Sequence, residues 1–406
     1  EQEYKELVES ITEKDQDMYR IDNATTAPSA LNRVYSMDEY KGSVYSSTQN
    51  KEYQDWIKKD QKSNQFYRNN MMLTLSGNIL TEAMMAEKYQ ITTETLSEGY
   101  KLIDENKDLK LYENTFALPM IYATKNQVSQ KDYNKLQYPE NVITSYTNKI
   151  EDWDLETTDF KITDQENIEI TKEDDTYTID ASSKNSLTLT PSTNLEDKIV
   201  FLSIKNSYNK SCKRTKTDQS ITINGIKNKL TCRDWKYHNR NYTFHYVLVS
   251  PKELKVTFTE GKYKLTDISI TTIDKDVLLT AKDDITAATI DKTKTLGEQI
   301  TATITVPDKQ YLTIAIPYDK GFTITVDNKE VTYQENINNQ ISFPVEKGTH
   351  QIVITYNAPW KNIAVIISIV GILFLFINIW IENVKSCKRT VAHITKDRYN
   401  KKKRSR

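Results

Sequence analysis

The sequence predicts an α+β region at the N-terminal end, two mainly antiparallel β-sandwich domains after it, and one transmembrane helix near the C-terminal end. Three observations support this fold class. Helical and strand patterns mix up to about residue 150, apolar and polar residues then alternate with period two as far as residue 360, and residues 363–381 form an uncharged apolar run. With 406 residues, the chain can form two or three domains that each bury a core.

The first predicted domain, residues 1–150, carries two helical patterns. Apolar residues fall on one face of a helix over 51–62, and Ser47 or Thr48 is a suitable cap for its N-terminus. A second helix is expected over 78–88, where apolar residues recur at spacings of three and four. We interpret the aromatic and methionine side chains of both patterns as core packing rather than as a ligand pocket.

The second and third predicted domains, residues 151–275 and 276–360, are the sandwiches. Strand-like alternation recurs about every ten residues in both, and Asn224-Gly225 is a strong hairpin-turn signal in the first. The alternation lapses over 274–288, which predicts a boundary there. The stretch 317–321, Pro-Tyr-Asp-Lys-Gly between two alternating runs, is typical of a second hairpin turn.

The predicted transmembrane helix, residues 361–382, is followed by a predicted cytoplasmic tail, residues 383–406. Nineteen residues at about 1.5 Å each span roughly the 30 Å hydrocarbon core, and Trp360 and Trp380 stand at the two ends as interfacial aromatics. Residues 382–406 contain ten basic side chains and two acids, a net charge of +8, whereas the rest of the chain has −9. By the positive-inside rule, we expect residues 1–360 to lie outside the cell membrane. A buried helix of a soluble protein and a nucleic-acid-binding tail are the alternatives, but the adjacent span explains the charge without nucleic acid.

The chain opens Glu1-Gln2-Glu3-Tyr4, without Met, a basic segment or an apolar segment, although an exported region of this size needs an upstream signal. We therefore expect it to be the C-terminal part of a longer membrane protein. Phosphate-binding glycine loops and the HExxH zinc motif are absent from the sequence, so no cofactor or metal is expected. Two DxD triplets, Asp15-Gln16-Asp17 and Asp152-Trp153-Asp154, match a metal-binding pattern of sugar transferases, but solvated loops are the simpler interpretation in so acidic a chain.

Cysteine usage agrees with export. Cys212 and Cys232 are the two cysteines of the predicted outside region, and closing their loop of about 20 residues would stabilise it by roughly 3 kcal/mol. We predict that they form a disulfide; two free thiols are the alternative. Cys387 lies on the predicted reducing side and should be unpaired.

Several phrases occur in a characteristic order, and the last of them directly precedes the membrane helix. They are Tyr19-Arg20-Ile21, Gly42-Ser43-Val44-Tyr45-Ser46-Ser47, Ala86-Glu87-Lys88-Tyr89, Leu111-Tyr112-Glu113-Asn114 leading to Ala117-Leu118-Pro119, Ile316-Pro317-Tyr318-Asp319-Lys320-Gly321, Val326-Asp327-Asn328-Lys329, Lys347-Gly348-Thr349-His350 and Tyr356-Asn357-Ala358-Pro359. Over nearly its whole length the chain resembles the C-terminal half of the YfhO family of bacterial membrane proteins. It departs from the family at Phe322, where Trp is common, and at Asn328, where Gly is common.

The resemblance implies a polytopic glycosyltransferase of the GT-C type. Such an enzyme transfers a sugar from a polyprenyl-phosphate carrier to a cell-envelope polymer such as teichoic acid. Its catalytic carboxylate is expected in an early extracellular loop, upstream of this chain, so no catalytic residue is assigned here. The partners implied are the lipid bilayer, the polyprenyl-phosphate sugar donor and the glycopolymer acceptor.

Within this chain, the predicted substrate-binding residues belong to the N-terminal region: Tyr19, Arg20, Tyr45, Ser46 and Ser47. Arg20 offers a cation for a phosphate, and the others offer aromatic faces and hydroxyls suited to sugars. The alternative is that these residues only cap and pack the fold.

A hypothesis of a different class is also open: a non-catalytic, membrane-anchored module that binds glycan or cell wall. About a dozen further upstream spans, with an Asp in an early outside loop, would support the enzyme. A signal peptide directly before Glu1 would support the anchored module.

Overall fold

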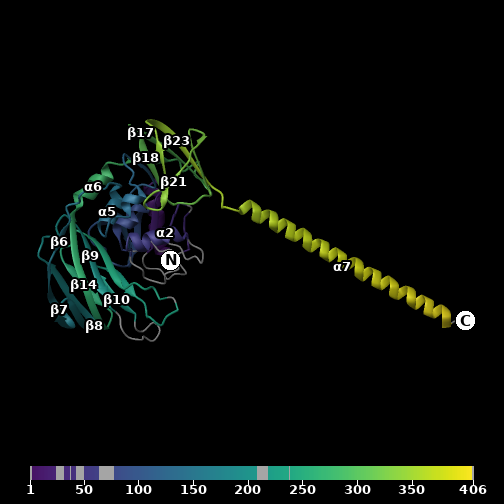
Figure 1. The fold of residues 1–406 in the computed structure, drawn as a ribbon, viewed down its shortest axis with the longest axis horizontal. Coiled ribbons are helices and arrows are strands. Elements are labelled where there is room, and N and C mark those ends of the chain that lie inside the picture. Colours follow the sequence, from purple (N-terminus) through teal and green to yellow (C-terminus); the bar gives the residue numbers. More distant parts are fainter. Residues whose placement is uncertain are drawn as a thin grey trace. The chain divides into compact units, whose positions relative to one another are not determined.

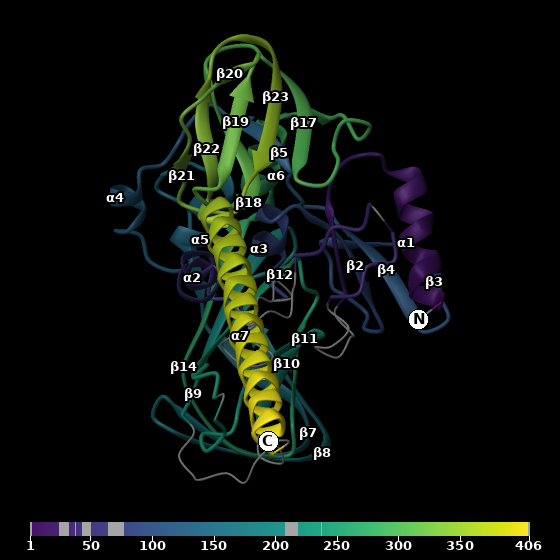
Figure 2. The same cartoon turned by 90° about the vertical axis from the view of Figure 1, so that its right-hand side faces the viewer.

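The computed structural model describes residues 2–23, 32–36, 38–42, 50–63, 77–207, 218–236 and 238–404. These residues form two compact units. The first contains residues 1–319 and 324–354, and the second contains residues 320–323 and 355–406. Figures 1 and 2 show the elements of both units.

The chain begins with helix α1 (Gln2–Lys14), which lies on a four-stranded sheet of order β1-β2-β4-β3. The strands are β1 (Arg20–Asn23), β2 (Glu87–Thr92), β3 (Tyr100–Asn106) and β4 (Leu109–Asn114). Tyr4, Leu7, Val8 and Ile11 recur at helical spacing and are buried. They pack against Tyr89, Ile91 and Leu111 of the sheet. This small core fixes the start of β1, where Tyr19 and Arg20 lie.

Short helices follow: α2 (Lys51–Asp55), the π-helical segment η2 (Trp56–Asp60), α3 (Ile79–Met84), α4 (Gln130–Tyr133) and α5 (Glu140–Thr147). The helix predicted over 51–62 is present over 51–60, with its second half π-helical, and its cap is Asn50, whose side chain accepts a hydrogen bond from the Tyr53 amide. The proposed caps Ser47 and Thr48 lie outside the described residues. The helix predicted over 78–88 is too long, because Ala86 has a positive φ of 55° and the chain continues as β2.

Among the described residues, the largest sheet has nine strands. Seven run in the order β11-β10-β13-β8-β14-β9-β12, while β6 pairs with β14 and β7 with β8. Their bounds are β6 (Glu156–Thr158), β7 (Phe160–Glu173), β8 (Thr176–Pro191), β9 (Lys198–Asn206), β10 (Gln219–Ile223), β11 (Ile226–Leu230), β12 (Thr243–Val249), β13 (Leu254–Phe258) and β14 (Gly261–Asp274). The predicted Asn224-Gly225 turn joins β10 and β11, with positive φ at both residues as a tight hairpin requires.

Strand β9 has apolar side chains on both faces of this sheet. Val200, Leu202 and Ile204 belong to the core on one face. Ile199 and Phe201 belong to a second core, which joins the sheet to α2, η2, α3, α5 and the later helix α6 (Lys275–Asp283). Burial on both faces explains why this segment is a continuous apolar run rather than an alternating one.

Helix α6 (Lys275–Asp283) accounts for the lapse in alternation over 274–288. Two five-stranded sheets follow, of order β15-β5-β18-β22-β21 and β16-β17-β23-β19-β20. The strands are β5 (Ile121–Thr124), β15 (Thr286–Ala287), β16 (Thr289–Ile290), β17 (Gln299–Val306), β18 (Gln310–Pro317), β19 (Phe322–Val326), β20 (Lys329–Glu330), β21 (Gln334–Glu335), β22 (Gln340–Val345) and β23 (Gly348–Tyr356). Sheet β15-β5-β18-β22-β21 therefore takes β5 from the N-terminal region.

The hairpin predicted at 317–321 is wrong. Strand β18 pairs with β5 and β22, whereas β19 lies between β23 and β20, so the segment connects two different sheets. A true tight turn joins β19 to β20, where Asp327 and Asn328 have φ values of 50° and 64°. This conformation accounts for Asn328 at a position where glycine would also be favoured.

The second unit contains helix α7 (Lys361–Arg404), which is 44 residues long. It is long and apolar enough to cross a membrane. Its large apolar side chains from Ile363 to Ile381 are 38% exposed or more. The α+β start, the mainly antiparallel sheets and the C-terminal helix confirm the predicted fold class.

Candidate functional site

The structure describes only some of the residues that the sequence predicts for the site and the disulfide. Tyr45, Ser46, Ser47 and Cys212 lie outside the described residues. Cys232 is buried and disulfide-bonded. Its backbone amide also donates to Asp218 Oδ1 at 2.8 Å. The pairing of Cys232 with Cys212 remains a prediction.

The Arg20 guanidinium points into the protein. Its Nη1 donates to the main-chain oxygen of Met85 and, at 2.8 Å, to that of Ala315. Burial lowers the pKa of Arg20, while Tyr53 and Glu87 act to raise it. Since Ala315 belongs to β18, the side chain ties the N-terminal sheet to a sheet nearly 300 residues later in the chain. These contacts support the packing alternative for Arg20.

Tyr19 is buried in the small core under α1, with 4% of its surface exposed. Its ring packs edge-to-face against Tyr89, with 4.9 Å between ring centroids, and its hydroxyl donates to the Asp15 main-chain oxygen at 3.2 Å. The ammonium groups of Lys88 and Lys292 lie 5.8 and 6.0 Å from the ring centroid. The Tyr19 ring therefore makes cation–π contacts with two lysines and leaves little open surface for a sugar to stack on.

Tyr19 also lines a cavity of 550 Å³. The walls come from the end of the α1–β1 connection, from β2 and β4, from the Ala117–Ile121 segment, and from residues 282–290, which include the end of α6. The lining residues are Asp17, Met18, Tyr19, Lys88, Glu113, Ala117, Leu118, Pro119, Met120, Ile121, Lys282, Asp283, Ile285, Ala287, Ala288, Thr289 and Ile290. We call this hollow the Tyr19 cavity.

The two lysines of the Tyr19 cavity differ in how they are held. Lys88 Nζ forms an ion pair of 2.6 Å with Asp15 Oδ2, which also accepts a hydrogen bond from the Tyr89 hydroxyl at 2.9 Å. Burial acts to raise the pKa of Asp15, but these hydrogen bonds and that from the Asp17 amide lower it overall. The first Asp of the DxD triplet is thus an ion-pair partner of Lys88.

Lys282 lies at the end of α6 and donates to the main-chain oxygen of Thr115 at 2.6 Å. Burial lowers the pKa of Lys282, Lys88 lowers it further, and Glu113 acts to raise it. An ammonium has three donors, so an anion entering the cavity could accept from this group. The Tyr19 cavity therefore combines a partly desolvated cation, Lys282, with a second cation that is already paired, and three carboxylates, of Asp17, Glu113 and Asp283, also line it.

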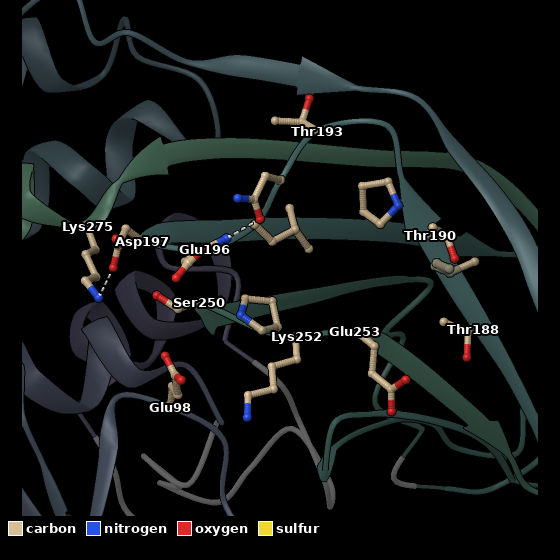
Figure 3. Close-up of a pocket in the computed structure, with 15 residues that line it drawn as sticks. Glu98, Thr188, Thr190, Thr193, Glu196, Asp197, Ser250, Lys252, Glu253 and Lys275 are labelled. Carbon is tan, nitrogen blue, oxygen red and sulfur yellow. Dashed lines mark hydrogen bonds and ion pairs between the residues drawn. The ribbon is translucent and has the colours of Figure 1, made fainter.

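A second cavity, of 610 Å³, lies at one end of the nine-stranded sheet (Figure 3). Its lining includes the carboxylates Glu98, Glu196, Asp197 and Glu253, against Lys252 and Lys275. Lys275 is in an ion pair with Asp197. The excess of carboxylates and the hydroxyls of Thr188, Thr190 and Thr193 suit a neutral, hydroxyl-rich ligand better than a polyanion. We call this hollow the carboxylate cavity.

One buried carboxylate near the N-terminal sheet was missed by the sequence reasoning. Glu82 of α3 is fully buried and accepts a hydrogen bond from the Tyr100 hydroxyl. Burial is the main reason that its pKa is raised to about 7, and the nearby Asp22 raises it too. In the sequence, Glu82 is only a polar position within the apolar helical pattern over 78–88. The shift of its pKa depends on burial and on contacts with Tyr100 and Asp22, which only the fold creates.

Lys282 was also missed, since a single lysine at the end of a short helix has no sequence signature. Lys88 and the segment 117–119 belong to two of the sequence phrases that carry the family resemblance, and both line the Tyr19 cavity. Among the described residues, no group of three or more His, Cys, Asp or Glu side chains could hold a metal ion.

A family model described as "Bacterial membrane protein YfhO" matches residues 1–368. A Bacillus subtilis (strain 168) protein named "Uncharacterized protein YfhO" is 26% identical over 120 residues, which is 30% of this chain and 14% of that relative. A crystal structure of a conserved protein of unknown function from Pseudomonas aeruginosa PAO1 aligns with 50% of this chain and 93% of its own, at 8% identity and a TM-score of 0.15. That TM-score is too low to support a shared fold.

Proposed function

The chain belongs to the YfhO family of bacterial membrane proteins, and from this premise we propose that it is the extracytoplasmic C-terminal part of a polytopic membrane glycosyltransferase. The enzyme would move a sugar from a polyprenyl-phosphate carrier to a cell-envelope polymer such as teichoic acid. The observation that carries the proposal is the family match over residues 1–368, which ends inside the membrane-crossing helix α7. The catalytic carboxylate is proposed to lie in a part of the enzyme upstream of this chain.

In this proposal, residues 1–360 lie outside the membrane and hold the acceptor, and the tail after α7 is cytoplasmic. The acceptor carries phosphate, so its binding site needs an available cation in a partly desolvated hollow. Lys282 in the Tyr19 cavity meets both conditions. The carboxylate cavity does not, because Lys275 is in an ion pair with Asp197 and Lys252 is exposed. The acceptor contact is therefore proposed for Lys282, beside the predicted residue Tyr19.

The test uses the complete enzyme, upstream spans included, and compares Lys282→Gln with Lys252→Gln. The second variant makes the same charge change in the carboxylate cavity, where Lys252 is exposed. A lost hydrogen bond to a charged group is worth about 1.5 to 3 kcal/mol, so kcat/KM for the acceptor should fall roughly 10- to 100-fold in Lys282→Gln alone. Melting temperatures show whether either variant is unfolded.

Equal activity of Lys282→Gln and the unchanged enzyme would rule out the acceptor contact. Absence of any glycosyl transfer by the complete protein, together with retention of purified cell-wall glycan, would instead favour the membrane-anchored binding module.

A further inference from the structure

The second unit contains a cavity of 450 Å³ directly before the membrane-crossing helix. It is lined by Lys320, Gly321, Phe322, Thr323, Asn357, Ala358, Pro359, Trp360, Lys361, Asn362 and Ile363. Two short stretches of chain form it, and they are joined where the Asn357 amide donates to the Gly321 main-chain oxygen at 2.9 Å. We call this hollow the juxtamembrane cavity. Three of its lining residues, Lys361, Asn362 and Ile363, are the first three residues of α7.

The charged side chains that line the juxtamembrane cavity are positive. Lys320 and Lys361 line it, and among the residues that the structure describes no Asp or Glu does. Both lysines are exposed, and within the part of the chain that the structure describes neither side chain has an ion pair or hydrogen bond. Elsewhere in the described chain many lysines are paired, as Lys309 is with Glu346 at 2.7 Å. Two unpaired ammonium groups at one hollow can both serve an anionic ligand.

The aromatic residues at the juxtamembrane cavity suit a membrane surface. The rings of Phe322 and Tyr356 pack with 4.7 Å between their centroids. Trp360 is 76% exposed, and its φ of 67° is rare for a bulky residue. The exposed indole lies one residue before the apolar helix α7. Tryptophan favours the headgroup level of a bilayer.

From these observations we propose that the juxtamembrane cavity binds the headgroup phosphate of an anionic membrane phospholipid, with Lys320 and Lys361 contacting the phosphate and Trp360 lying at the headgroup level. The helix that follows fixes the depth of the cavity, because α7 enters the hydrocarbon core within a turn of Lys361. A basic hollow at that level lies beside the lipid phosphates. The proposal does not rest on glycosyl transfer.

The test reconstitutes the full-length protein in nanodiscs of phosphatidylcholine alone or mixed with phosphatidylglycerol. Lipid that stays bound after transfer to mild detergent is then counted by native mass spectrometry. The unchanged protein should retain phosphatidylglycerol in preference to phosphatidylcholine. At about 1 kcal/mol for each lysine near an anionic surface, Lys320→Gln/Lys361→Gln should reduce that preference about 30-fold.

The matched control is Lys329→Gln/Lys347→Gln, which removes two exposed lysines that do not line the cavity. The basic tail is the same in all three proteins, so its own attraction for anionic lipid cancels in the comparison. Lys320→Arg/Lys361→Arg should keep the preference. An equal loss in both Gln pairs, or no preference in the unchanged protein, would overturn the proposal. Because this experiment measures bound lipid and not sugar transfer, a negative result would not count against the proposed glycosyltransferase activity.

Discussion

Replacing Arg20 with Ala separates packing from acceptor binding. In the folded protein the guanidinium donates to the main-chain oxygens of Met85 and Ala315 and lies near Glu87. The substitution leaves both oxygens without this donor and removes the cation that offsets the Glu87 charge. Removing one partner of a buried charged group typically costs about 3 to 5 kcal/mol.

The lower figure is the better expectation for Arg20, because the residue as a whole is only partly buried. At roughly 2 °C per kcal/mol for a protein of this size, Arg20→Ala should lower the melting temperature by about 6 °C. Arg20→Lys should recover part of that loss, since one ammonium can reach one of the two oxygens but cannot reproduce the planar fork. Calorimetry on the three proteins measures the shifts.

Polymer glycosylation per folded molecule of the complete enzyme is measured on the same variants. If Arg20 only packs, this quantity should not change. Arg20→Ala with an unchanged melting temperature and weaker glycosylation would refute the reasoning and restore Arg20 as an acceptor contact. The sequence prediction that Arg20 contacts a phosphate would then stand.

Three further predictions follow from single observations. The pKa of Glu82 is raised from 4.5 to about 7, so the folded state binds this proton more tightly than the unfolded state does. The protonated carboxyl therefore stabilises the fold fully below pH 4.5. This contribution falls by about 3 kcal/mol as the pH rises from 4.5 through 7. Urea unfolding across that range should show a much smaller fall for Glu82→Gln, and an identical fall in both proteins would contradict the titration. Peptide mapping without reduction should find Cys232 linked to Cys212, and a linkage to any other thiol would exclude that pairing. Protease added to intact cells should digest residues 1–360 and spare the tail, and cleavage of the tail would reverse the proposed orientation.

The fold class could be predicted because its signals are local. The Asn224-Gly225 turn, the alternation of β10 and β13, and the uncharged run of α7 each depend on a few neighbouring residues. The failed hairpin at 317–321 shows the limit of such signals. A turn-like composition says that the chain changes direction, but not which strand it pairs with next.

The contacts that hold the site could not be predicted, because they join distant parts of the chain. Arg20 reaches Ala315 across 295 positions, and Gln340 Nε2 donates to the Met84 main-chain oxygen across 256. Asn338 Nδ2 donates to the Ser145 main-chain oxygen across 193. Each bond pairs a polar side chain with a main-chain oxygen, an acceptor that every residue has. Sequence alone therefore cannot single out the partner.

The same geometry explains why Lys282 is a better candidate for an anion than Arg20. Arg20 already gives hydrogen bonds to two main-chain oxygens, so a phosphate would have to displace them and leave both unsatisfied. Lys282 gives one bond, to Thr115, and burial has already lowered its pKa. An anion bound beside Lys282 would offset that burial and raise the pKa again. Acceptor binding and protonation of Lys282 are then linked, so affinity should fall as the pH rises through the pKa of the free site, and Lys282→Gln should remove that dependence.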